Sequence, residues 1–232
     1  MLEQRRNSDV ISELLNLQGK RVLDVGSGDG ALVRLLTRKG AKVTGIECNP
    51  RQLSKANATE KAGDERYLDG RGEAMPVDDE STDIVIFFNS LHHVPVEGQD
   101  QALIEASRVL IPNGQLYISE PIASGAYFEM MKPFDDETHV RAEALNAISR
   151  ATETLFDQER EVTYFYPDII ADYETFAEET TRIDSARDEL FKTRDVELRQ
   201  AFNAYGVKQA DGRFAFDQPM RVNLLIKKNT AT

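Results

Sequence analysis

Short apolar runs alternate with segments of helical periodicity between residues 20 and 121, and this alternation limits the folds open to the chain. The apolar runs read as five strands: "KRVLDV", "AKVTGIE", "ERYLD", "TDIVIFFNS" and "QLYISEP". Patterns typical of helices lie between them, as in "ALVRLLTRK" and "DQALIEASRVL". Such alternation predicts a mostly parallel, doubly wound α/β sheet with helices on both faces. Ligands of these sheets bind at the carboxyl ends of the strands.

The pattern changes after residue 121. We expect a helix over 135–156, a strand over 161–167, helices over 170–182 and 185–205, and a terminal strand over 220–228. Residues 122–217 also hold 14 of the 18 aromatic residues. We therefore predict one domain over 1–232, made of a binding core at 1–121, a helical lid and substrate-side elaboration at 122–217, and a terminal strand at 218–232.

The composition restricts the partners of the chain. A net charge of -12 at pH 7 argues against a nucleic-acid substrate, which needs a basic surface. The longest strongly apolar run, "IVIFF" at 84–88, is far too short to span a membrane. One cysteine excludes an internal disulfide, and the first residues lack the apolar segment of a secretory leader. We therefore expect a cytoplasmic protein.

A glycine-rich turn, "VLDVGSGDG" at 22–30, follows the first strand. Its "GSGDGA" satisfies the dinucleotide pattern G-x-G-x-x-G/A, and Glu47 at the end of the second strand suits ribose hydroxyls. Asp24 and Asp29 disfavour the binding of a diphosphate at this turn, because two like charges about 4 Å apart repel by roughly 4 kcal/mol at an effective dielectric of about 20. The turn therefore favours a ligand with a ribose and positive charge, while an NAD-dependent oxidoreductase stays open as an alternative.

Three stretches, met in order, resemble the class I methyltransferases that use S-adenosyl-L-methionine (SAM). "LDVGSGDG" matches their strand-(D/E)-x-G-x-G-x-G motif, and "GEAMPVDDESTDIVIFFNSLHHV" and "RVLIPNGQLYISEP" are similar to the fourth and fifth strand regions of the ubiquinone/menaquinone-biosynthesis branch. The likeness covers about residues 10–121. It implies a Rossmann-like sheet of seven strands with an antiparallel C-terminal strand. It also implies in-line methyl transfer from SAM to a small molecule, with S-adenosyl-L-homocysteine as product.

The resemblance implies roles for individual residues. Asp24 would orient the methionine ammonium, and Glu47 would accept both ribose hydroxyls. Glu73 and Ala74 would flank the adenine, and Asn89 would face the methionine portion. The complete predicted cofactor set is Asp24, Gly26, Ser27, Gly28, Gly30, Glu47, Cys48, Glu73, Ala74 and Asn89.

The residues for catalysis and for the acceptor are expected outside this set. Arg71 stands where the branch often has an Asp that accepts from the adenine amine, so that contact must come from elsewhere. His93 is the candidate general base, because histidine titrates near neutrality. Tyr127, Tyr164 and Tyr166 are candidate contacts to an apolar or aromatic acceptor, although core packing explains each equally well. No constellation of metal ligands is visible, so we expect no metal. A protein that binds SAM without methyl transfer is the further alternative.

Overall fold

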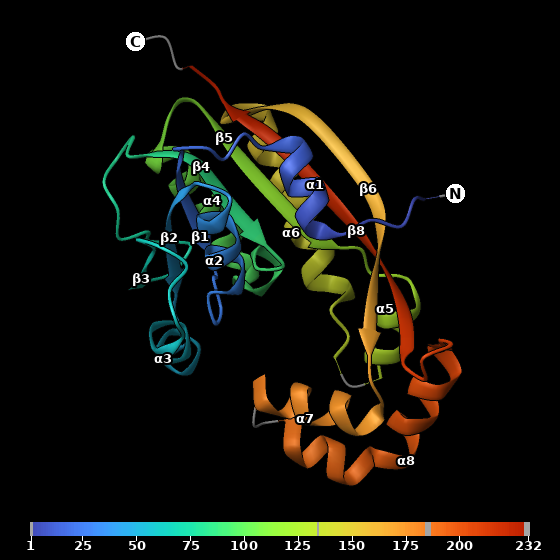
Figure 1. Ribbon diagram of the computed structural model, residues 1–232. Coiled ribbons are helices and arrows are strands. Elements are labelled where there is room, and N and C mark those ends of the chain that lie inside the picture. The colour runs from blue at the N-terminus through green and yellow to red at the C-terminus, as the bar shows by residue number, and fades with distance from the viewer. Residues whose placement is uncertain (1, 134, 184–186, 230–232) are drawn as a thin grey trace. The chain divides into compact units, whose positions relative to one another are not determined.

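The computed structural model describes residues 2–133, 135–183 and 187–229, which form two compact units (Figure 1). Unit 1 comprises Met1–Asn7, Pro121–His139 and Thr163–Met220. Unit 2 comprises Ser8–Glu120, Val140–Val162 and Arg221–Thr232. The region 122–217, expected to be one lid, is therefore divided, because residues 140–162 pack with unit 2. Whether the two units act as a single domain stays a prediction.

A mixed sheet organises the chain. Its order is β3-β2-β1-β4-β5-β8-β6, with the short β7 paired to β8. Strands β1 to β5 pair in parallel, and the C-terminal strands are antiparallel. The bounds are β1 Arg21–Val25, β2 Lys42–Glu47, β3 Arg66–Asp69, β4 Thr82–Phe88, β5 Leu110–Pro121, β6 Phe156–Ile170, β7 Val207–Lys208 and β8 Phe214–Lys227. The predicted doubly wound fold is confirmed, and the strand order reverses between β1 and β4, where such sheets bind ligands.

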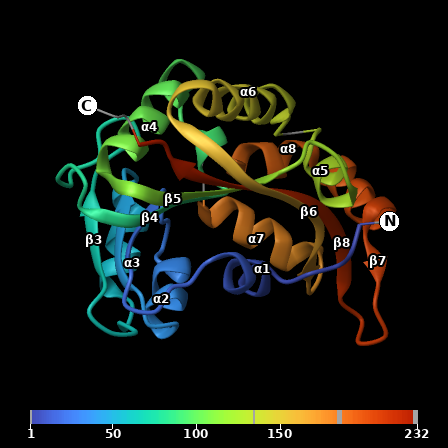
Figure 2. The same ribbon diagram turned by 90° about the horizontal axis from the view of Figure 1, so that it is seen from above.

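Helices of unit 2 cover both faces of its strands. Figure 2 shows α4 (Val96–Val109) and α6 (Thr138–Thr154) on one side, with α1 (Asn7–Leu14) and α2 (Ala31–Arg38) on the other. Leu23 and Val25 of β1 share a buried cluster with residues of α4 and α6. Because side chains alternate along a strand, Val22 and Asp24 face the side of α1 and α2. Asp24 therefore points into a helix-covered layer.

The helix α3 (Pro50–Ala58) begins as its sequence predicts. Asn49 is the N-cap, and its side chain accepts hydrogen bonds from the backbone of Arg51 at 3.0 Å and of Gln52 at 3.4 Å. Pro50 occupies the first helical position, where its missing N–H costs nothing. This start fixes the chain directly after β2, and so fixes the residues that end that strand.

Unit 1 has its own aromatic core. It contains α5 (Ala126–Met131), α7 (Tyr173–Ile183) and α8 (Arg187–Tyr205). The rings of Tyr173, Phe176 and Phe202 lie 5.8–6.2 Å apart, and Phe216 lies 4.9 Å from Phe202. Much of the aromatic content of the second half therefore serves to hold this unit together.

Several element bounds differ from the sequence prediction. Strand β6 begins at Phe156 rather than 161, because "DQERE" is exposed and polar and carries no apolar alternation. Helix α5 was not expected, since six residues are too few for a periodic signal. The first two residues of the helix expected over 185–205, and residues 230–232 of the terminal segment, lie outside the described residues. Within the described ranges, no helix is both long and apolar enough to cross a membrane.

Replacing Phe202 by Ala tests the packing of the aromatic core in unit 1. Phe202 is 1% exposed, so the truncation leaves a cavity among the aromatic rings. We expect the free energy of unfolding to fall by about 3–5 kcal/mol, measured by urea denaturation. The neighbouring exposed Asn203, changed to Ala, is the matched control and should cost under about 1 kcal/mol. Equal effects of the two substitutions would contradict the packing described above.

Candidate functional site

The glycine turn joins β1 to α2 and lies at the carboxyl edge of the parallel strands. Gly26 has φ 75°, and a Cβ there would lie 2.6 Å from Cβ of Ser90, so only glycine fits without a shift. Gly28 has φ 56°, and a Cβ there would meet nothing within 4 Å. The turn therefore packs tightly at its start and borders open space at its middle, where a ligand can approach the backbone.

Glu47, at the end of β2, holds this turn in place. One carboxylate oxygen, Oε2, accepts from the backbone N–H of Gly28 at 2.7 Å, and Oε1 accepts from that of Asn49 at 2.7 Å. Glu47 as a whole is 8% exposed. Each oxygen still has a lone pair for a further donor. Glu47 is thus placed beside Gly28 with capacity left for the predicted ribose hydroxyls.

Asp24 is the unusual group of the site. It is 1% exposed, and its Oδ2 has no hydrogen-bond partner among the described residues. Burial, and then the nearby charge of Glu47, raise the pKa of Asp24 to about 7. The hydroxyl of Ser27 in the turn is also buried, and no described residue pairs with it. Buried polar groups are usually satisfied, so the unpaired atoms fit a site that a polar ligand completes. A carboxylate so placed favours a cation.

Asp29 has a different role, although it lies in the same turn. Its Oδ2 is 2.7 Å from Nζ of Lys55, and its Oδ1 accepts from the N–H of Ala31 at 3.2 Å. The hydrogen bond from Lys55 lowers the pKa of Asp29. Asp29 is therefore a neutralised group that orders the start of α2. Only one of the two aspartates in the turn region is left to attract a ligand.

The residues expected around the adenine lie after β2 and β3. The backbone N–H of Ala74 donates to the carbonyl of Arg71 at 3.2 Å, which closes a small loop that carries Glu73 between them. Cys48 follows Glu47 and is exposed, and burial followed by the charge of Glu47 raises the pKa of its thiol. The structure holds these residues and Asp24 within unit 2. Their contact with adenine stays a prediction.

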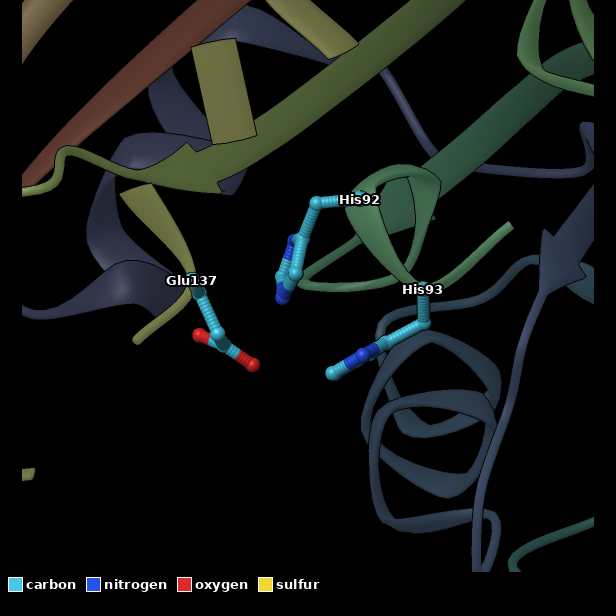
Figure 3. A group of neighbouring side chains, drawn as sticks. All are labelled: His92, His93 and Glu137. Atoms are coloured by element: carbon cyan, nitrogen blue, oxygen red, sulfur yellow. The ribbon is translucent and has the colours of Figure 1, made fainter. Parts of the chain in front are cut away.

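The end of β4 leads into η1, a short 3-10 helix at Leu91–His93. Asn89 is exposed and has φ 52°, a left-handed conformation that Asn tolerates better than most residues. Figure 3 shows the rings of His92 and His93 side by side, with centroids 4.1 Å apart; Glu137, drawn with them, belongs to unit 1. His92 is 4% exposed, whereas His93 is exposed to solvent. The candidate base His93 therefore neighbours a buried second histidine.

Sequence reasoning missed two residues at this edge. Glu120, near the end of β5, accepts from the backbone of Ser90 at 3.2 Å and of Leu91 at 2.9 Å, and it contacts Nδ1 of His92. Ser90 donates its hydroxyl to the carbonyl of Val25 at 2.6 Å. The rule that ligands bind at the carboxyl ends of strands applies to β5 as well, and it would have identified Glu120.

The three candidate acceptor contacts all lie in unit 1. Tyr164 is fully buried, and its hydroxyl donates to Oδ1 of Asn7 at 2.6 Å, which is typical of a core residue. Tyr127 is half-buried and meets Phe216 edge-on at 6.5 Å. Tyr166 is also half-buried. Contact of these side chains with an acceptor stays a prediction.

The raised pKa of Asp24 predicts how stability depends on pH. The folded chain holds this proton up to about pH 7, whereas an unperturbed carboxyl loses it near 3.8. Between these values the folded state binds more protons than the unfolded state, so the contribution of Asp24 to the free energy of unfolding falls as pH rises. The loss from pH 4 to pH 7 is on the order of 3 kcal/mol.

The substitution Asp24→Asn removes the titrating group and so tests this pH-dependent loss of stability. Urea denaturation of both proteins without ligand, at pH 4.5 and pH 7.5, should show the wild type losing more stability than the variant as pH rises. Other titrating groups act on both proteins and cancel in the comparison. An equal change in the two proteins would show that Asp24 is not buried and unpaired in solution.

Comparisons with known proteins give the family model, the relatives and the solved structures that this chain matches. Residues 23–118 match the family model described as a methyltransferase domain. The chain is 35% identical over 121 residues to 27-O-demethylrifamycin SV methyltransferase of Amycolatopsis mediterranei, covering 50% of this chain and 44% of that protein. It is 34% identical over 113 residues to ubiquinone biosynthesis O-methyltransferase of Pseudomonas entomophila, covering 47% of each. The chain thus matches less than half the length of these curated relatives.

Solved structures support the fold over nearly the whole chain. The YcgJ protein of Bacillus subtilis covers 95% of this chain and 97% of its own, with TM-score 0.61 and 18% identity. Geranyl diphosphate C-methyltransferase of Streptomyces coelicolor, solved with S-adenosyl-L-homocysteine, covers 95% of this chain and 78% of its own, with TM-score 0.57 and 15% identity. Together with the sequence matches, these findings confirm the expected resemblance. Residues 23–118 therefore match a methyltransferase domain, and the solved structures share the fold of the chain.

Proposed function

We propose that this protein transfers a methyl group from SAM to a small-molecule acceptor. The observation that carries the proposal is the buried carboxyl group of Asp24, whose Oδ2 has no partner among the described residues and which lies just before the glycine turn with its open middle at Gly28. SAM combines an adenosine with an ammonium and a sulfonium and has no phosphate, so it suits a site next to the carboxyl groups of Asp24 and Glu47. The names of the curated relatives support the same reaction class. A cytoplasmic location is part of this proposal.

Different residues of unit 2 are proposed to bind different parts of SAM. Asp24 attracts the ammonium, and Glu47 accepts the ribose hydroxyls while it fixes the turn through Gly28. Glu73 and Ala74 flank the adenine, and Asn89 faces the methionine portion. The bound cofactor supplies an already activated methyl group, so the protein has mainly to align the acceptor. Alignment of this kind supplies roughly 7–11 kcal/mol of barrier reduction.

The acceptor is proposed to be apolar or aromatic. The names of two relatives refer to a demethylrifamycin and to ubiquinone biosynthesis. Unit 1 adds aromatic side chains, of which Tyr127 and Tyr166 are half-buried and keep surface for a ligand. Tyr164 belongs to the predicted set but already pairs with Asn7. We therefore expect Tyr127 and Tyr166 to matter more for the acceptor than Tyr164.

Calorimetric titration tests the cofactor assignment. Purified protein should bind SAM and S-adenosyl-L-homocysteine and show no saturable binding of NAD. Asp24→Asn should weaken SAM by about 10- to 100-fold, because a hydrogen bond to a charged group contributes about 1.5–3 kcal/mol. Asp64→Asn, at an exposed carboxylate after α3, is the matched control and should leave the affinity unchanged. Binding of NAD alone would overturn the proposal.

A panel of methyl acceptors tests the substrate class. Radiolabelled SAM is incubated with phenols, hydroquinones and aliphatic alcohols, and separately with polar amino acids and sugars. We expect label to pass to members of the first group and, for an accepted phenol, KM to rise about 10-fold or more in Tyr166→Ala, since burying an aromatic contact contributes about 1.5–3 kcal/mol. Turnover of the polar group alone would contradict the acceptor class. SAM binding with no transfer to any acceptor or cell extract would favour a protein that binds SAM without methylation.

A further inference from the structure

The connection between β3 and β4, residues 70–81, contains no helix. Parallel strands are usually joined by a helix, which satisfies its own backbone groups. A loop in that place must find partners for its backbone N–H and C=O groups elsewhere. Glu73 and Ala74, the proposed neighbours of the adenine, lie in the first half of this loop. Whatever holds the loop therefore affects the adenosine side of the proposed cofactor site.

Two charged side chains of α4, Glu105 and Arg108, bind the backbone of the loop. The N–H of Met75 donates to Oε2 of Glu105 at 2.9 Å, and the carbonyl of Met75 accepts from Nη2 of Arg108 at 2.9 Å. Nη1 of Arg108 donates to the carbonyl of Val77 at 3.0 Å and to Oδ1 of Asp79 at 2.6 Å. Hydrogen bonds with a charged partner are stronger than neutral ones. Residues one turn apart on α4 thus hold the middle of the loop.

Glu105 and Arg108 also hold each other, and we call this pair the clamp. Nε and Nη2 of Arg108 donate to the two carboxylate oxygens of Glu105 at 2.8 and 2.7 Å. The side chains are 12% exposed for Glu105 and 30% exposed for Arg108. The hydrogen bond from Arg108 lowers the pKa of Glu105, and the same bond raises the pKa of Arg108, so both stay charged at neutral pH. The two parallel bonds give the clamp a fixed geometry.

Apolar contacts of α4 reach the same loop. Met75 is 3% exposed and shares a buried cluster with Ala102 and Leu103 of α4. At the start of α4, a Cβ placed on Gly98 would lie 2.9 Å from Cγ of Glu73, so the helix backbone and this side chain are already close. The loop therefore follows α4 from the first turn of the helix to the last, and the place of Glu73 depends on that helix.

We propose that Glu105 and Arg108 are positioning residues for SAM, which act on its affinity by holding the loop that carries Glu73 and Ala74. This inference rests on the proposed methyl transfer and adds the element that fixes the adenosine side of the cofactor site. Neither side chain of the clamp has to touch the ligand. When the binding-competent form of a protein is only partly populated, its apparent affinity falls by that fraction. Breaking the clamp therefore weakens SAM by releasing the loop.

The variant Arg108→Lys tests the clamp by calorimetry with SAM. Lysine keeps the positive charge but lacks the planar fork that reaches two carbonyls and Glu105 together. A loop in place for a tenth of the time binds about 10-fold more weakly, so we expect the Kd for SAM to rise by about 10-fold with an unchanged stoichiometry. A merely structural defect would lower the fraction of protein that binds and leave the Kd as it is, which would overturn the proposal.

The matched control is Asp100→Asn on the same helix. Asp100 forms an exposed ion pair with Arg150 at 2.9 Å and has no recorded contact with the loop. This variant should keep both the Kd and the stoichiometry of the wild type. An equal rise of the Kd in Asp100→Asn and Arg108→Lys would contradict a role that is specific to the clamp.

The variant Gly98→Ala separates positioning from stability. Alanine favours a helix more than glycine does, so the free energy of unfolding in urea should stay the same or rise. The added Cβ displaces the side chain of Glu73. We expect this variant to bind SAM several-fold more weakly than the wild type although it is at least as stable. Equal affinity of the two proteins would show that the place of Glu73 does not matter for SAM, and would overturn the proposal.

Amide hydrogen exchange, followed by NMR without ligand, tests the clamp independently of SAM. In Arg108→Lys the N–H of Met75 should exchange about 10-fold faster or more than in the wild type, because the loop opens locally. The N–H of Val85, in the buried strand β4, should exchange as before. Faster exchange at Met75 with an unchanged Kd would overturn the positioning role. A wild type that binds no SAM would overturn the proposed function itself, while the exchange rates would still report on the clamp.

Discussion

A buried carboxyl group with one oxygen left without a partner by the described residues is the constraint on which this account depends. Asp24 lies on a central strand with 1% of its surface exposed and one oxygen unpaired. A protein that only needed a stable sheet would place an apolar residue there, as it does at Val22 on the same face. The pKa of Asp24, raised to about 7, expresses the cost of keeping this group away from water. A bound cation offsets that cost, so the position makes sense as half of a binding interaction.

The topology of the sheet explains why the other groups meet Asp24. Strands β2 and β4 flank β1 in parallel, so the residues that end each strand lie along one edge. Glu47 comes from β2, Asn89 from β4, and Glu120 from the next strand, β5. The acidic residues make different contacts. Glu47 accepts from the backbone of Gly28 in the glycine turn, Asp29 pairs with Lys55 at the start of α2, and Glu120 contacts His92. The acidic residues at this edge of the sheet thus have individual structural roles and are not a general surface property.

The sequence alone allowed the parallel sheet to be predicted, together with the positions of the glycine turn, Asp24 and Glu47 at the ends of its strands. Those signals are local: apolar runs, glycine spacing and residues that directly follow strands. It did not distinguish Asp24 from Asp29, because the difference depends on Lys55, which is 26 residues further along the chain than Asp29. It did not reveal the contact between His92 and Glu120 for a related reason, since Glu120 lies on another strand. The division of 122–217 was also missed, because packing of 140–162 with the sheet is a long-range property.

The most direct test of the central claim is a thermodynamic cycle between Asp24 and the ammonium group of the ligand. S-adenosyl-L-homocysteine and 5′-methylthioadenosine both have a neutral sulfur, and the second lacks the amino-acid portion. Affinities of the wild type and Asp24→Asn for both compounds are measured by calorimetry at pH 8, where Asp24 is ionised. The account predicts that the substitution weakens the first compound about 10-fold or more and leaves the second nearly unchanged. An equal loss for both compounds would contradict it, since Asp24 would then support the site without meeting the ammonium.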